Sequence, residues 1–229
     1  MKKALALVSG GKDSIYSTYL NYLRGWQISL LTFEPISEES FMLHIPNVNF
    51  VKLQAKAWNL KLYYFKVSGR EEKEVDEMIE YISRILEKEN YNYLITGANA
   101  SDYQFKRIVK ICEELGLKLK APLWLRDPIN TLEKIVKEDK IEFLLTRVPE
   151  YGLGRKWIGK RLTKENLDKF LEICNEYKIH PLGEGGEYET FVVYIPIWKK
   201  KIKIKKVKIV FDGTVYTYVI EKAKLVNVS

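Results

Sequence analysis

Ser9-Gly10-Gly11-Lys12-Asp13-Ser14 is the stretch that decides which fold the rest of the chain is expected to adopt. It follows the apolar run Ala4–Val8, which is typical of a strand buried on both faces of a parallel sheet. Apolar residues at helical spacing come after it, at positions 15, 19, 22 and 23. The hexapeptide is therefore predicted to be a strand-to-helix turn. Its glycines, the free N–H groups of the helix start and the charge of Lys12 would together form a cradle for phosphate.

The spacing differs from that of a Walker A loop, Gly-x-x-x-x-Gly-Lys-Ser/Thr, in which four residues separate the two glycines. Here Lys12 follows the glycine pair directly and Asp13 comes next, which suits a Mg²⁺ ion carried on the phosphates. The alternative is an ordinary helix start, capped by Asp and Ser after a glycine turn. Phosphate and metal binding is favoured because all six residue types suit that one task.

The hexapeptide resembles the signature of the PP-loop ATP pyrophosphatases, Ser-Gly-Gly-x-Asp-Ser. Enzymes of that group cleave ATP between the α and β phosphates. The resemblance implies that the loop grips pyrophosphate while AMP is transferred to a substrate.

The first half of the chain alternates between predicted strands and helices. Strands are expected at residues 4–8, 28–33, 62–67 and 93–96, and helices at 15–23, 50–58, 71–89 and 105–115 with Gly116 as a stop. This alternation predicts an α/β fold with a doubly wound, mostly parallel sheet of the PP-loop or HUP type. The ATP-binding domain is expected to span residues 1–121.

The pattern changes after residue 121, which predicts a second, smaller α+β domain over residues 122–229. Helices are expected at 128–137 and 163–177, the latter with Thr163 as N-cap, and strands at 142–148 and 191–195. A β-hairpin follows at 198–228, with a bulge at 205–206 and a turn at Asp212-Gly213. Its lysine row is either a nucleic-acid stripe or a solvated face that blocks edge pairing, and the solvated face is favoured.

Composition and net charge limit the classes of partner and the location that the sequence allows. The 229 residues carry a formal net charge of +8, which admits an anionic substrate, an acidic protein or nucleic acid as partner. No apolar run is long enough to cross a membrane, and the first residues do not form a signal peptide. Cys112 and Cys174 lie at apolar helical positions and are expected in the core, so a cytoplasmic protein without structural zinc or disulfides is predicted.

A second motif, His180-Pro-Leu-Gly-Glu-Gly-Gly-Glu-Tyr-Glu-Thr190, crowds three carboxylates around three glycines. Glycines in such density mark unusual backbone angles or close approach of a ligand, and the glutamates could bind Mg²⁺, attract ammonium or act as a base. The alternative is a solvated turn before the next strand. A functional loop is favoured because a plain turn needs neither the repeated Gly-Glu nor Thr190.

Together the two motifs resemble the diphthine–ammonia ligase family of N-type PP-loop enzymes. The resemblance extends over about residues 1–197 and also includes segments 39–47, 69–75, 97–104 with Arg107, 122–124, 152–154 and 157–159. The lysine-rich tail has no match in it. Two residues depart from the family pattern: Asn99 stands where an apolar residue is expected, and Lys160 stands where arginine is commoner.

The resemblance implies ATP-dependent amidation of diphthine, a modified histidine on translation elongation factor two. ATP would adenylate the carboxylate, and ammonia would then displace AMP. Free ammonium is the simpler nitrogen source, because the chain has only two histidines and no cysteine in a glutaminase-like context. The alternatives are a PP-loop tRNA-modifying enzyme and an ATP-binding regulatory module without turnover. Thiolating members of the first class usually need a cysteine pair or metal-binding cysteines, and this chain has neither. A nucleic-acid partner is disfavoured, and a homodimer is left open.

The residues expected at the site fall into four groups. ATP is assigned to Ser9, Gly10, Gly11, Lys12, Asp13 and Ser14, with adenine near Thr32, Phe33 and Gly97 at strand ends. Catalysis is assigned to Lys12, Asp13, Glu184, Glu187 and Thr190, and Mg²⁺ to Asp13. Substrate contacts are assigned to Asn99, Tyr103, Trp124, Tyr188 and Glu189.

Overall fold

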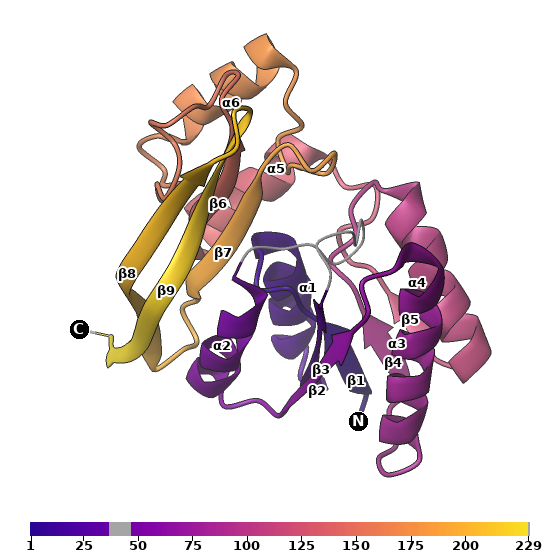
Figure 1. Ribbon diagram of the computed structural model, residues 1–229. Coiled ribbons are helices and arrows are strands. Elements are labelled where there is room, and N and C mark those ends of the chain that lie inside the picture. The colour runs from indigo at the N-terminus through magenta and orange to yellow at the C-terminus, as the bar shows by residue number, and fades with distance from the viewer. Residues whose placement is uncertain (37–46, 229) are drawn as a thin grey trace. The chain divides into compact units, whose positions relative to one another are not determined.

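The computed structural model describes residues 1–36 and 47–228, and the chain divides into two compact units (Figure 1). The first unit comprises Met1–Ser9, Asp13–Val51 and Leu60–Leu125. The second comprises Gly10–Lys12, Lys52–Asn59 and Arg126–Ser229. The middle of the hexapeptide therefore groups with the second unit, although both of its flanks belong to the first.

The first unit is built on a five-stranded parallel sheet. Its strands are β1 (Lys3–Leu7), β2 (Gln27–Pro35), β3 (Leu62–Val67), β4 (Tyr93–Ile95) and β5 (Lys118–Lys120), in the order β3-β2-β1-β4-β5. The order reverses at β1, as in doubly wound folds, whose ligands bind outside the carboxyl ends of the strands at that reversal. The α/β expectation is confirmed, and the hexapeptide follows the strand at which the order reverses.

Helices complete the first unit: α1 (Lys12–Tyr22), the short 3₁₀ turn η1 (Val48–Phe50), α3 (Glu71–Leu86) and α4 (Asp102–Leu115). Helix α4 ends before Gly116 as its sequence predicts, but it begins at Asp102, three residues earlier than expected. The Ser101 side chain accepts a hydrogen bond from the Gln104 N–H at the start, and Gly116 adopts φ 66° at the end.

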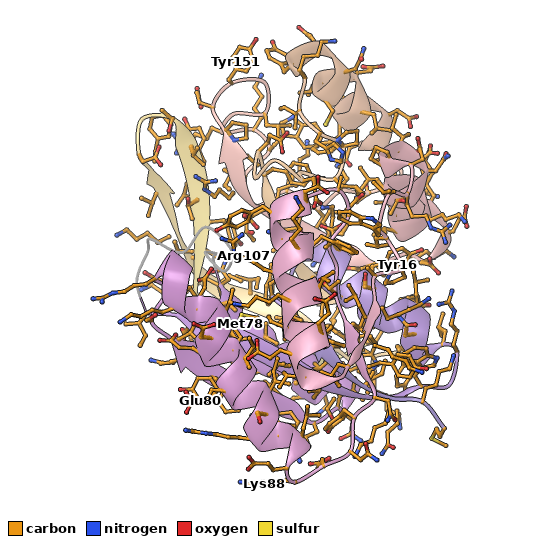
Figure 2. The ribbon with its side chains drawn as sticks, turned by 90° about the vertical axis from the view of Figure 1, so that its right-hand side faces the viewer. Tyr16, Met78, Glu80, Lys88, Arg107 and Tyr151 are labelled. Carbon is orange, nitrogen blue, oxygen red and sulfur yellow. The ribbon has the colours of Figure 1, made fainter. Side chains whose placement is uncertain are left out.

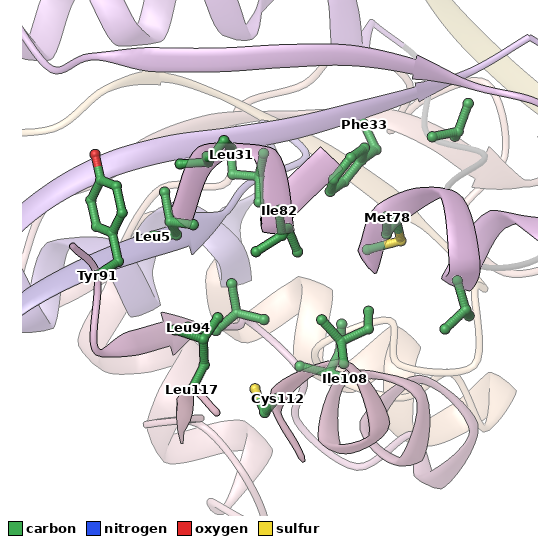
Figure 3. Packing of buried hydrophobic residues seen from close by; sticks show 14 residues of the cluster. Leu5, Leu31, Phe33, Met78, Ile82, Tyr91, Leu94, Ile108, Cys112 and Leu117 are labelled. Atoms are coloured by element: carbon green, nitrogen blue, oxygen red, sulfur yellow. The ribbon is translucent and has the colours of Figure 1, made fainter. Parts of the chain in front are cut away.

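A hydrophobic cluster fixes α3 and α4 on one face of the sheet (Figure 3). Strand residues such as Leu5, Leu31 and Leu94 contribute to it, and Met78 and Ile108 contribute from the two helices. The apolar stripe of α3 therefore points inward, while Glu80 of the helix and Lys88 just beyond its end are exposed (Figure 2).

The second unit is built on a four-stranded antiparallel sheet. Its strands are β6 (Glu142–Pro149), β7 (Glu189–Tyr194), β8 (Lys200–Phe211) and β9 (Val215–Asn227), in the order β7-β6-β9-β8. Its helices are α2 (Val51–Trp58), α5 (Pro128–Glu133), the π-helical η2 (Lys134–Glu138) and α6 (Leu167–Tyr177). A separate antiparallel sheet confirms that a second, α+β fold accompanies the parallel one.

The hairpin of β8 and β9 forms for local reasons. The Asp212 carboxylate accepts hydrogen bonds from the N–H groups of Thr214 and Val215, and Gly213 adopts φ 99°. The pairing register shifts around Lys206, which confirms the predicted bulge.

Several element boundaries differ from the sequence predictions. Strand β5 was not expected, because its three residues contain two lysines and one apolar residue. Helix α6 begins at Leu167 rather than near Thr163, since the Asn166 side chain closes a preceding turn by accepting from the Thr163 N–H and donating to the Arg161 carbonyl. Helix α3 ends at Leu86, three residues early, and Leu23, expected on the apolar face of α1, is 55% exposed.

Candidate active site

The flanks of the hexapeptide form a compact turn in the first unit. The Ser14 hydroxyl accepts a hydrogen bond from the Ser9 N–H at 3.3 Å and lies 3.3 Å from the Ser9 hydroxyl. Gly10 adopts φ 91°, a left-handed angle that favours glycine. The turn thus brings the two serines of the motif together at the start of α1, as expected of a strand-to-helix loop.

Gly97 allows the loop after β4 to approach the start of α1. A Cβ atom on Gly97 would lie 2.5 Å from the Ser14 backbone nitrogen and 2.7 Å from the Asp13 carbonyl carbon. Only a residue without a side chain fits there. The structure therefore places Gly97 directly against the second half of the hexapeptide.

The other two residues assigned to adenine lie inside β2 rather than at its end, because the strand continues to Pro35. Thr32 is fully buried, and its hydroxyl donates to the Val8 carbonyl at 2.9 Å. Phe33 is 2% exposed and packs in the hydrophobic cluster beside Phe65 and Tyr81. The expected strand end at Phe33 is therefore corrected to Pro35.

Lys12 is buried within the second unit, with 2% of its surface exposed. Its ammonium group donates to the Leu182 carbonyl at 2.6 Å and lies 4.9 Å from the centre of the Tyr188 ring. Its backbone N–H donates to the Thr190 hydroxyl at 3.0 Å. One of the helix-start N–H groups expected to be available to phosphate is thus occupied by Thr190.

The backbone carbonyl of Gly10 accepts hydrogen bonds from two donors of the second unit. Its carbonyl accepts from the Val192 N–H at 2.9 Å and from the Gln54 side-chain amide at 3.0 Å. The same Gln54 nitrogen donates to the Val192 carbonyl at 2.8 Å, and Gln54 has no exposed surface. Sequence reasoning did not assign Gln54 to the site. The sequence offers one indication of its role: Gln54 is the single uncharged polar residue of α2, whose other residues are apolar or lysine.

The glycine-rich acidic loop, residues 180–188, is folded on itself. Gly183 and Gly186 adopt φ 70° and 76°, as the glycine content predicted. The His180 ring nitrogen Nδ1 accepts from the Leu182 and Glu184 N–H groups, at 3.2 and 3.4 Å. The Tyr188 hydroxyl donates to the Pro181 carbonyl at 2.6 Å, which places its ring beneath the Lys12 ammonium.

Glu187 points back into its own loop. Its Oε1 accepts from the His180 N–H at 3.1 Å, and its buried Oε2 has no hydrogen-bond partner among the described residues. Glu189 opens β7 opposite Arg147, and Thr190 follows it with 4% exposure. Glu184 is half-buried in the loop.

Three residues assigned to substrate lie together in the first unit. The Asn99 carbonyl accepts from the Leu125 N–H at 2.8 Å, and the neighbouring Trp124 ring stacks on Phe105 at 3.8 Å between centroids. Tyr103, in the first turn of α4, is 36% exposed, and the Arg107 guanidinium lies 3.4 Å over its ring (Figure 2 labels Arg107). The other two, Tyr188 and Glu189, belong to the second unit.

The cysteines take no part in this site. Cys112 and Cys174 are free and buried, as expected, and burial raises the pKa of each thiol to about 12. The charge of Glu187 adds to the effect at Cys174. A thiol with so high a pKa is a poor nucleophile and a poor metal ligand at neutral pH.

Residues 1–36 and 47–228 contain no group of three or more His, Cys, Asp or Glu side chains placed to hold a metal ion. No helix among them is long and apolar enough to cross a membrane. Segment 39–46, part of the family resemblance, lies outside the described residues.

Comparison with known proteins gives a consistent assignment. The diphthamide synthase N-terminal domain matches residues 1–119, and the diphthamide synthase C-terminal domain matches residues 127–226. The match therefore continues through the lysine-rich tail, where sequence inspection found no resemblance.

Individual relatives agree with the two domain matches. The human diphthine–ammonia ligase is 32% identical over 232 residues, covering 92% of this chain and 86% of that protein. The Schizosaccharomyces pombe diphthine–ammonia ligase is also 32% identical, over 91% of this chain, but the chain spans only 37% of that protein. A crystal structure from Methanocaldococcus jannaschii, described as a predicted subunit of tRNA methyltransferase, aligns with a TM-score of 0.43 at 20% identity, covering 86% of this chain and 98% of that one.

Proposed function

The chain belongs to the diphthamide synthase family, and we propose that it catalyses the ATP-dependent amidation of diphthine on translation elongation factor two. The human and Schizosaccharomyces pombe relatives are diphthine–ammonia ligases, enzymes that form a C–N bond. In the proposed reaction the diphthine carboxylate attacks the α phosphorus of ATP and pyrophosphate leaves. Ammonia then attacks the acyl carbon of the adenylate, and AMP leaves with the electron pair of the broken C–O bond.

One observation carries this proposal: the Thr190 hydroxyl accepts a hydrogen bond from the Lys12 N–H within one compact unit. The contact joins the two motifs that are 178 positions apart in the chain. A phosphate loop alone would suit many ATP-using enzymes. A phosphate loop bonded to an acidic, glycine-rich loop suits one that also handles ammonium.

We assign the adenylation half-reaction to the hexapeptide. Gly10, Gly11 and the start of α1 would offer N–H groups to the phosphates, and Ser9 and Ser14 would offer hydroxyls. Lys12 would neutralise charge on the departing pyrophosphate, for which its ammonium must exchange the Leu182 carbonyl for phosphate oxygen. Adenine would lie at the carboxyl edge of the sheet, near Thr32, Phe33 and Gly97.

The donor set of the loop fits Mg²⁺ through Asp13, the only carboxylate in the hexapeptide. Magnesium commonly takes one or two carboxylates and completes its shell with substrate phosphates and water, so a three-residue protein cluster is not required. When bound, the ion would offset the charge of the pyrophosphate leaving group.

We assign the amidation half-reaction to the acidic loop. Ammonium must lose one proton before it attacks and another as the amide forms, so a nearby carboxylate is needed as base. Glu184 and Glu187 are the proposed groups, and Thr190 ties their loop to Lys12. Asn99, Tyr103, Trp124, Tyr188 and Glu189 are proposed to contact the substrate. The reaction is proposed to occur in the cytoplasm.

The decisive experiment supplies the protein with ATP, Mg²⁺, ammonium and diphthine-bearing elongation factor two. AMP, pyrophosphate and a mass change of the factor corresponding to an amide are expected, each dependent on all components. AMP formed with a tRNA acceptor but not with the factor would instead support a tRNA-modifying enzyme. ATP binding without AMP release with any acceptor would support a regulatory module.

A further inference from the structure

The net charge of this protein is concentrated in the β8–β9 hairpin. Residues 199–227 contain nine lysines and two acidic residues, so they carry seven of the eight net positive charges of the chain. The preceding 198 residues are almost neutral, although they contain most of the charged side chains. A charge imbalance confined to one hairpin is a local feature and does not follow from the overall composition.

Five exposed lysines of the hairpin form what we call the lysine cluster: Lys203, Lys205, Lys206, Lys222 and Lys224. The register places Lys203 directly opposite Lys224 and Lys206 directly opposite Lys222, with Lys205 in the bulge between them. Like charges directly opposite each other on neighbouring strands destabilise a sheet. The proximity is also visible in the pKa of Lys205, which Lys203 and Lys224 lower most.

Protection of a sheet edge does not account for this arrangement. An edge strand needs scattered lysines along its own length to discourage pairing, and it gains nothing from lysines opposed on the partner strand. Glu221 forms an ion pair with Lys206 at 2.7 Å, and it is the only acidic residue of β8 and β9. The cluster therefore retains mutual repulsion that an external anionic group would relieve.

We propose that the lysine cluster is a docking surface for an acidic face of the protein that carries the residue to be amidated. This inference rests on the proposed function, because only a macromolecular substrate needs a binding surface outside the reaction site. Clustered charges on an exposed ribbon raise the rate of encounter and release the partner readily, which suits an enzyme that must let its product go.

The residue types favour a protein partner over nucleic acid. All nine cations of the hairpin are lysines, whereas bidentate binding of phosphate is characteristic of arginine. Single-stranded nucleic acids also need aromatic rings on which bases stack. The lysine cluster contains none, and the ring of Phe211 near the turn is already stacked on Tyr216 at 4.4 Å.

The test compares two triple variants of the full chain that lose the same charge. One is Lys203→Gln/Lys205→Gln/Lys224→Gln in the cluster. The control is Lys88→Gln/Lys118→Gln/Lys169→Gln, at exposed lysines elsewhere. Fluorescence anisotropy measures the Kd for labelled, diphthine-bearing elongation factor two. At low salt, the cluster variant should bind about tenfold more weakly than wild type. The control variant should bind less than about twofold more weakly than wild type.

Two further readouts complete the test. Raising ionic strength from about 0.05 M to 0.5 M should weaken wild-type binding and affect the cluster variant much less. The cluster variant should be no less stable to urea than wild type, since its removed charges repel one another. Equal Kd values for both variants, or a loss confined to a single-stranded RNA probe, would overturn the proposal. Because binding is measured apart from turnover, absence of amide formation by wild type would count against the proposed function alone.

Discussion

The side-chain amide nitrogen of Gln54 lies 3.0 Å from the carbonyl oxygen of Gly10, so helix α2 holds the second residue of the phosphate-loop hexapeptide. The same nitrogen donates to Val192 in β7 at 2.8 Å. One buried side chain thus joins the loop to the strand that carries Thr190. The loop geometry is therefore expected to depend on a buried residue that lies outside the hexapeptide.

Replacing Gln54 should weaken ATP use more than it weakens the fold. Gln54→Met keeps the length of the side chain but removes both hydrogen bonds, at a cost of about 1–2 kcal/mol of unfolding free energy. Because Gly10 loses one of its two donors, KM for ATP should rise several-fold while kcat changes less. Initial rates of pyrophosphate release and urea unfolding measure the two effects.

The matched control for Gln54 is Gln27→Met, at an exposed position that begins β2. It should leave both KM for ATP and stability close to wild type. If Gln54→Met behaves like this control, the contact does not position the loop, and the role given to Gln54 would be withdrawn.

The products of ATP cleavage test the identity of the loop. The wild-type protein with all substrates should give AMP and pyrophosphate in ³¹P NMR spectra. Lys12→Met and Asp13→Ala should each lower turnover by about 100-fold or more, since in the proposed mechanism Lys12 offsets charge on the leaving pyrophosphate and Asp13 would hold the Mg²⁺ that does the same. Circular dichroism should show that both variants remain folded. ADP and phosphate as products would be incompatible with a PP-loop mechanism.

The sequence predicted the strand-to-helix turn of the hexapeptide because its determinants are local. A glycine turn, a helix start and a strand are properties of neighbouring residues, so Ser9 to Ser14 could be assigned without knowledge of the fold. The partners of that loop could not be predicted in the same way. Gln54 meets Gly10 across 44 positions and Val192 across 138, and no periodicity in α2 indicates which strand its polar side chain will meet.

The same distinction holds for the fold. Long elements with clear periodicity, such as α3 and the β8–β9 hairpin, were predicted close to their bounds. Strand β5 was missed because Lys118-Leu119-Lys120 gains its strand conformation from pairing with β4 and has little apolar character of its own. The burial of Lys12 also could not be predicted, since it depends on a carbonyl and a ring supplied 170 and 176 positions later.

Glu89 should make the stability of the first unit depend on acid pH. Its carboxylate accepts hydrogen bonds from Lys61, from Tyr63 at 2.6 Å, from Lys3 at 3.1 Å and from Tyr91 at 3.0 Å. These bonds, led by that from Lys61, lower the pKa of Glu89 well below its ordinary value of 4.5. A depressed pKa stabilises the folded state above the unfolded pKa, and the effect is lost as pH falls below about 4.5.

Glu89→Gln should therefore lower the unfolding temperature clearly at pH 7, and the difference from wild type should shrink as the pH is reduced towards about 3. The control is Glu172→Gln, at an exposed position of α6, which should have little effect at either pH. A difference that stays constant across this range would mean that the charge of Glu89 is not what stabilises the fold.

Glu187 allows the amidation half-reaction to be separated from ATP binding. Gln has the same shape as Glu and can still accept the hydrogen bond that Glu187 Oε1 receives from the His180 N–H, so Glu187→Gln should preserve the loop. What it removes is the charge and basicity of the carboxylate. If Glu187 attracts ammonium or accepts its proton, the variant should bind ATP normally yet lose most amide formation.

The competing explanation is that Glu187 only folds the loop before β7. In that case Glu187→Gln would keep amide formation within about twofold of wild type, a change of only ~0.4 kcal/mol in the barrier. Varying ammonium sharpens the comparison. If Glu187 recruits ammonium, Glu187→Gln should raise KM for ammonium and leave KM for ATP unchanged. If the variant instead disturbs the loop, both KM values should change, because Thr190 and Leu182 of that segment bind Lys12. Unchanged amidation at subsaturating ammonium would remove Glu187 from the mechanism and leave Glu184 as the remaining proposed base.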